Sequence, residues 1–116
     1  MGFIAQAYLK LGQQDKFEDA MSSFKAALDA QIAEGANNWV LTQSEAFYAM
    51  LSNDHEAAIT LLEKAFQQGL YIDTVAETAW PVFKPLDGDP RYEAAKATML
   101  VRWNAEMEKI TSEQSL

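Results

Sequence analysis

The chain has 116 residues and a mass of 13.0 kDa, enough for one small domain with a modest core. Its formal charge is −8, so it repels phosphate backbones, and nucleic-acid binding by this chain is disfavoured. It has no cysteine, which excludes disulfides and cysteine-based metal sites, and no run of about 20 apolar residues that would span a membrane.

Helical periodicity dominates the first part of the chain, where apolar residues recur every three to four positions. A first helix over residues 3–11 is expected to end at Gly12, because glycine adopts the left-handed conformation that stops a helix. Asp15 is expected to cap a second helix, whose apolar stripe continues to Ile32 before the interruption at residues 35–38.

The same periodicity predicts a second pair of helices. A third helix is expected over residues 39–51, and residues 52–54 form a turn with the polar side chains that cap helices. A fourth helix then continues to Gly69. No segment alternates with a period of two for long enough to predict a strand.

The pattern changes after Gly69. Residues 74–77 have the form of a capping box, which predicts a short fifth helix to about residue 80, followed by an irregular segment over residues 81–88. Asp89 followed by Pro90 is the favoured start of a helix, and a last helix is expected from Pro90 to about Ile110. Residues 90–116 hold four acidic and four basic residues, so the charge of −8 belongs to residues 1–89.

The two helix pairs are similar to each other. Ala20, Phe24 and Ala27 recur as Ala58, Leu62 and Ala65, at a constant offset of 38 residues. The small residues allow a helix to approach its neighbour closely, and the large one fills the space between them. Because each helical hairpin has an apolar face that it cannot cover alone, the hairpins are expected to stack.

This pattern resembles the tetratricopeptide repeat family, whose usual period is near 34 residues. The signature positions in the two units are Ala5, Tyr8, Gly12, Ala20, Phe24, Ala27, Ala46, Ala49, Asn53, Ala58, Leu62 and Ala65. Neither unit keeps the family's tryptophan near the start of its first helix or its closing proline. The resemblance implies an all-α fold, a right-handed superhelix of helical hairpins, with two hairpins over residues 1–69 and a capping region over residues 70–116.

The segment over residues 80–92 resembles a closing segment of bacterial multidomain proteins, in which an aromatic-x-Pro-Leu motif, an acidic pair and Pro-Arg-aromatic follow the last repeat. The resemblance implies that the chain is the C-terminal part of a larger bacterial protein. It also implies a capping last helix, which shields the apolar edge of the stacked hairpins. A cytoplasmic location is expected, or a periplasmic one if the larger protein has an upstream membrane segment.

Residue patterns for catalysis are scarce, and we expect no enzymatic activity, no catalytic residues, no cofactor and no bound metal. The only histidine, His55, lies between two acidic residues whose side chains point to different faces of a helix. Glycine-rich phosphate loops and nucleophile triads are absent from the sequence. Trp39, Trp80 and Trp103 are expected to anchor packing rather than to line a ligand pocket.

Function therefore rests on the resemblance, which implies a noncatalytic interaction and scaffolding module with a protein or peptide partner. Family members bind peptides on the face lined by their first helices, and the matching positions here form a neutral, apolar candidate groove. These positions are Gln6, Lys10, Gln43, Phe47 and Met50. Burial of Phe47 and Met50 under the C-terminal region is the alternative for that face.

Two other functional hypotheses stay open. In one, the repeats sense a small molecule or peptide and regulate an upstream DNA-binding, cyclase or kinase domain. In the other, the chain forms a homodimer through the exposed edge of its first helix. A protein binding partner would support the scaffolding module. A buried ligand pocket would support the sensor, and a dimer in solution would support association through the first helix.

Overall fold

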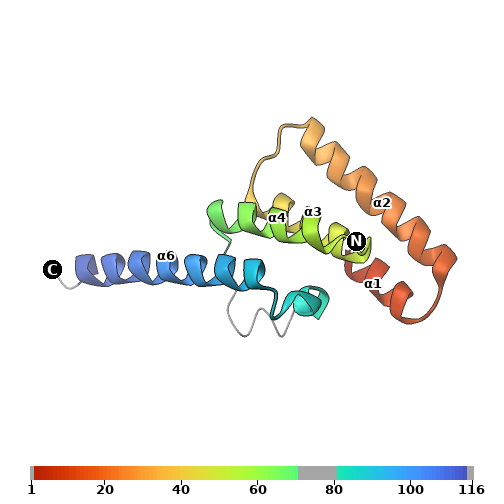
Figure 1. The fold of residues 1–116 in the computed structure, drawn as a ribbon. Helices are drawn as coiled ribbons and strands as arrows, with labels where there is room; N and C mark the ends of the chain where they lie inside the picture. The colour runs from red at the N-terminus through yellow and green to blue at the C-terminus, as the bar shows by residue number, and fades with distance from the viewer. Residues whose placement is uncertain (1, 71–80, 115–116) are drawn as a thin grey trace.

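The computed structural model describes residues 2–70 and 81–114, and the side chains of residues 4–70 and 82–111. All regular structure in these ranges is helical, which confirms the predicted all-α class for them. The helices are α1 (Gly2–Lys10), α2 (Gln14–Ala33), α3 (Trp39–Leu51), α4 (His55–Gln67), the 3₁₀ helix η1 (Pro81–Leu86) and α6 (Pro90–Gln114) (Figure 1). The short helix predicted at residues 74–80 lies outside the described residues.

The predicted helix ends are confirmed at several turns. Gly12 has a φ angle of 72°, the left-handed conformation expected of a glycine stop. The Asp54 carboxylate accepts a hydrogen bond from the Ala57 amide at 3.2 Å, and the Asp89 carboxylate accepts one from the Arg91 amide at 2.9 Å. Both aspartates therefore cap the helix that follows them, as their sequence positions indicate.

The expectation for the start of the second helix is wrong. The helix α2 begins at Gln14, and Gln13 occupies the cap position without a side-chain hydrogen bond. Asp15 lies inside the first turn, where its negative charge is still favourable near the positive end of the helix dipole. The last helix also continues four residues past its predicted end, from Ile110 to Gln114.

The hairpin of α3 and α4 is the centre of the core. Ala46 on α3 and Ala58, Leu62 and Ala65 on α4 are completely buried. Three of these four side chains are single methyl groups, so the two helix backbones approach closely, and Leu62 fills the space that remains. The two helices make the densest contact in the described part of the chain.

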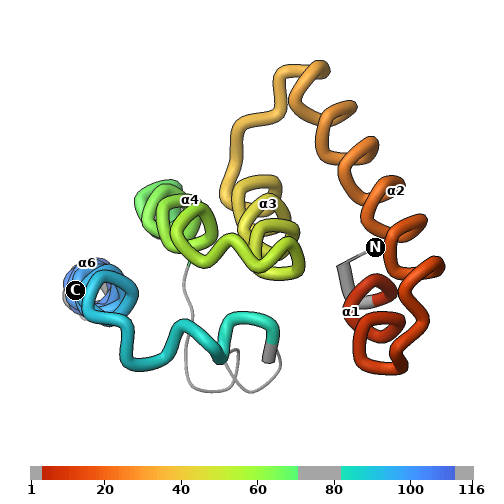
Figure 2. The backbone as a smooth tube through the Cα atoms, turned by 45° about the vertical axis from the view of Figure 1, so that its right-hand side comes forward, coloured from red at the N-terminus to blue at the C-terminus, as the bar shows by residue number. Residues whose placement is uncertain are grey.

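The hairpin of α1 and α2 packs against one side of this centre. The helix α1 contacts α2 and α3, and Ala5 is completely buried there. On α2, the Phe24 ring forms T-shaped contacts with Phe47 and Tyr48, with centroid separations of 6.3 and 5.5 Å. Past Leu28, however, every residue of α2 is exposed, because this helix runs obliquely away from α3 (Figures 1 and 2).

The segment η1 and helix α6 pack on the other parts of the central hairpin. The helix η1 contacts α3, where the Phe83 ring lies edge-on to Phe47 at a centroid separation of 6.1 Å. The helix α6 lies beside α4, so that α4 separates it from α3 (Figure 2). Tyr92 and Met99 are buried on the side of α6 that faces the core.

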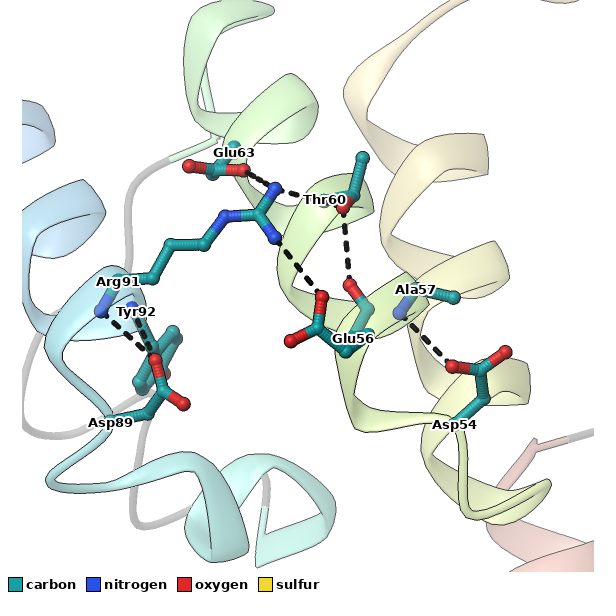
Figure 3. Close-up of polar contacts among 8 residues, drawn as sticks. All are labelled: Asp54, Glu56, Ala57, Thr60, Glu63, Asp89, Arg91 and Tyr92. Atoms are coloured by element: carbon teal, nitrogen blue, oxygen red, sulfur yellow. Dashed lines mark hydrogen bonds and ion pairs between the residues drawn. The ribbon is translucent and has the colours of Figure 1, made fainter.

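Arg91 joins the first turn of α6 to α4 (Figure 3). Its guanidinium donates hydrogen bonds to Glu63 and to the Thr60 hydroxyl, and it pairs with Glu56 at 3.5 Å. The hydrogen bond to Glu63, and then the charges of the neighbouring carboxylates, raise the pKa of Arg91 above its ordinary value. Because the group is exposed, this network orients α6 on α4 more than it stabilises the fold.

The resulting molecule is elongated, with extents of 58 × 35 × 21 Å. Its long axis follows α6, which extends away from the other helices towards the C-terminus (Figure 1). Within the described residues, none of the helices combines the length and apolar character needed to cross a membrane.

Replacing Phe47 by alanine should destabilise the chain by about 3–5 kcal/mol, because the ring is buried between α2 and η1. Chemical denaturation monitored by circular dichroism measures this change. The control is Lys10→Ala, an exposed position where a change within about 0.5 kcal/mol is expected. Equal unfolding midpoints for the two variants would contradict the position of η1 over Phe47.

Candidate functional site

The five residues of the candidate groove fall into two groups. On α1, Gln6 is half-buried and Lys10 is exposed. On α3, Gln43, Phe47 and Met50 are only 6%, 7% and 8% exposed. The structure thus brings α1 and α3 side by side. It also places η1 against α3 at Phe47, so this face follows the alternative given above, burial under the C-terminal region. This face offers a ligand Gln6 and Lys10, while its α3 residues lie beneath the surface.

Gln43 is the unusual residue on this face. Its side-chain Nε2 atom is buried and has no hydrogen-bond partner among the described residues. A buried amide donor without an acceptor costs about 1–3 kcal/mol relative to a bonded one. The amide is therefore a place where an acceptor atom, supplied by water or by a ligand, would be stabilising.

A second surface was not anticipated from the sequence. A groove of about 300 Å³ lies between α2 and the α3–α4 hairpin, where α2 runs away from α3. Its apolar residues are Leu28 and Ile32 from α2, Tyr48 and Ala49 from α3, and Ala57 and Leu61 from α4. Ile32 is 50% exposed, so one wall of the groove presents a large apolar side chain to solvent. A surface of this kind is characteristic of a site that receives an apolar partner.

The rim of this groove is acidic. Lys25, Asp29, Glu45 and Asp54 line it. Lys25 lies 3.6 Å from Asp29 on the same helix, so its charge is balanced locally. The remaining negative charge comes from Glu45 on α3 and Asp54 at the start of α4. The groove is therefore complementary to an apolar segment with positive charges beside it.

A third surface lies at the N-terminal edge of the molecule. A hollow of about 380 Å³ between α1 and α2 is lined by Ile4, Tyr8 and Ala20, with Lys16 and Asp19 at its margin. The Lys16 ammonium is 5.8 Å from the centre of the Tyr8 ring, so part of this hollow is already covered. This is the edge through which the homodimer hypothesis predicts association.

The residues that could support other chemistry are dispersed. His55 is exposed at the start of α4, and the described residues contain no cluster of three metal-binding side chains. Trp39 is partly covered and lies near the end of α4, where its Cδ1 atom is 3.9 Å from the position of a Cβ atom on Gly69. Trp103 lies on α6 and is 41% exposed, and Trp80 lies outside the described residues.

No family model, no curated protein and no solved structure matches this chain.

Proposed function

We propose that the chain is a noncatalytic interaction module, built as a right-handed superhelix of tetratricopeptide-like hairpins. We further propose that it binds a protein segment in the groove between α2 and the α3–α4 hairpin. The support for the repeat architecture is local. Two helical hairpins lie side by side, and Ala58 and Ala65, the small residues of the second copy of the 38-residue pattern, are completely buried. The support for binding is the groove itself.

The groove is the observation on which the functional proposal depends. It combines an apolar floor, a half-exposed isoleucine wall and a rim with an excess of carboxylates. Burying Ile32 and the partly exposed Tyr48 and Leu61 against a partner removes apolar area from water, at about 25 cal/mol per Å². A folded chain that keeps such a surface open is expected to use it for association.

The shape and charge of the groove define the expected partner. Its walls are helices, so a helical segment with apolar residues at positions i, i+3, i+4 and i+7 would lie between α2 and α4 as a further helix. Lysine or arginine residues beside the apolar ones would face Glu45 and Asp54. Phosphate groups and acidic segments are disfavoured by the same rim.

A display library of amphipathic helical peptides tests this proposal. Selected binders should be enriched in basic residues beside the apolar stripe, and their affinity should fall with added salt because Asp54 is exposed and Glu45 is partly exposed. Ile32→Glu should weaken binding at least about tenfold, equivalent to about 1.4 kcal/mol.

Ile4→Glu is the matched control for this experiment. It introduces the same charge at a residue that is 56% exposed on α1, outside the groove, and it should leave the affinity unchanged. Binders that are insensitive to Ile32→Glu, or that map by NMR chemical shifts to the face of Gln6 and Lys10, would contradict the assignment of the groove.

One observation favours the small-molecule sensor as a second candidate function. The unbonded Gln43 amide gives the face between α1 and α3 a buried polar group that could recognise a ligand acceptor. A ligand present at about 100 times its dissociation constant should stabilise the fold by about 2.7 kcal/mol, measured by thermal shift. This gain should disappear in Gln43→Met and persist in Gln6→Met. A ligand whose effect survives Gln43→Met would not use this amide.

A further inference from the structure

Glu45 differs from the other charged residues that line the groove between α2 and the α3–α4 hairpin. Lys25 and Asp29 pair with each other at 3.6 Å on α2. The Asp54 carboxylate accepts a hydrogen bond from the Ala57 amide at 3.2 Å (Figure 3). The Glu45 carboxylate has neither an ion pair nor a hydrogen bond among the side chains that the structure describes. It is therefore the one charge of this lining that is available in full to a partner.

The position of Glu45 exposes it to the effect of any helix that enters the groove. Glu45, Tyr48, Ala49 and Ser52 line the groove from α3, and their spacings of three and four residues place them on one face of this helix. Glu45 is already partly covered in the chain by itself. A segment that packs on this face of α3 covers the carboxylate further and removes part of its water.

A covered carboxylate needs a positive charge beside it. Without a cation, the loss of water disfavours the ionised group, and the complex is weakened. An apolar helix could pack on Leu28, Ile32 and Leu61, but it would leave Glu45 covered and unpaired. A helix with a basic residue at that height would replace the lost water by an ion pair. Glu45 thus acts against uncharged apolar helices as well as in favour of basic ones.

Asp54 is a weaker determinant than Glu45 for two reasons. It is the N-cap of α4, where the positive end of the helix dipole already balances part of its charge and disfavours a further cation. It is also exposed, and exposed ion pairs are screened by salt and contribute little to binding. Removal of its charge is therefore a matched control for removal of the charge of Glu45.

Tyr48 favours arginine over lysine as the partner of Glu45. Its side chain is partly exposed, three residues after Glu45 on the same face of α3, and its ring packs on Phe24 at a centroid separation of 5.5 Å. A guanidinium that pairs with the carboxylate can stack on this ring at the same time. A lysine ammonium forms the ion pair as a point charge and lacks the planar group that stacks.

Resting on the proposed binding of a helical segment in this groove, we infer that Glu45 determines which segments are accepted. The partner is an amphipathic helix with one arginine beside its apolar stripe, which pairs with Glu45 and lies against Tyr48. Apolar helices without this arginine are rejected, because they bury the carboxylate unpaired. A basic residue opposite Asp54 is not required.

Binding measurements with matched peptides and matched chains test this inference. The probes are helical peptides selected on the wild-type chain that lose affinity in Ile32→Glu, with each basic residue replaced in turn by leucine or by the other basic residue. Fluorescence anisotropy gives their affinities for the wild-type chain, Glu45→Gln and Asp54→Asn. Both substitutions remove one charge at nearly constant shape, and asparagine still caps a helix. Thermal melting followed by circular dichroism controls for the fold of the variants.

One arginine of each peptide should account for the recognition of Glu45. Its replacement by leucine should weaken binding to the wild-type chain at least about tenfold, and Glu45→Gln should weaken binding of the arginine peptide by a similar factor. The leucine peptide should bind Glu45→Gln more tightly than the wild-type chain, a reversal that a structural role of Glu45 would not produce. The lysine peptide should bind the wild-type chain about threefold more weakly than the arginine peptide. Asp54→Asn should change the affinity of the arginine peptide less than about threefold.

The possible results separate this inference from the assignment of the groove. Equal weakening by Glu45→Gln and Asp54→Asn would overturn the inference and leave the groove in place. A leucine peptide with the same affinity for Glu45→Gln and the wild-type chain would do so too. Equal affinities of the arginine and lysine peptides would overturn the contact with Tyr48. A library without binders that are sensitive to Ile32→Glu would contradict the groove itself, and this inference with it.

Discussion

The close contact between α3 and α4 is the constraint on which the other features of this structure depend. Ala46, Ala58 and Ala65 have no exposed surface, and any larger side chain at these positions would push the two helices apart. Helices α2 and α6 both contact this hairpin, and each is longer than the helix that it lies beside. The α3–α4 hairpin is thus the part of the described core on which the other elements pack.

Helix length then explains where the open surfaces are. The central helices α3 and α4 have 13 residues each, whereas α2 has 20 and α6 has 25. A helix longer than its neighbour continues past it, and its end is then more exposed than its middle. The exposed end of α2 forms one wall of the groove, and residues 100–111 near the end of α6 are exposed as well. The groove therefore results from the difference in length between α2 and the central helices.

Much of the fold follows from local signals in the sequence. Gly12, Asp54 and Asp89 mark helix boundaries because backbone conformation and capping depend on neighbouring residues, and the structure agrees at all three. Asp15 failed as a predicted cap because several polar residues in a row offer more than one start for the helix. In the second unit, Ala58 and Ala65 indicated where helices meet, because close approach requires small residues at those positions; their counterparts Ala20 and Ala27 are only partly buried.

The functional surfaces were harder to predict, because they depend on contacts between distant parts of the chain. Phe47 belongs to an apolar stripe on α3, but only the packing of Phe83 from η1 determines that its ring is covered. The groove depends on the angle at which α2 leaves α3, which is not encoded in any single residue of its lining.

Native-state hydrogen exchange measured at low protein concentration tests the central claim most directly. If the α3–α4 contact is the core and the end of α2 is open, amides in α3 and α4 should exchange only through global unfolding. Amides near the end of α2, after Leu28, should then exchange much faster. Protection at the end of α2 equal to that in α4 would show that the groove is closed in solution, and would contradict the account.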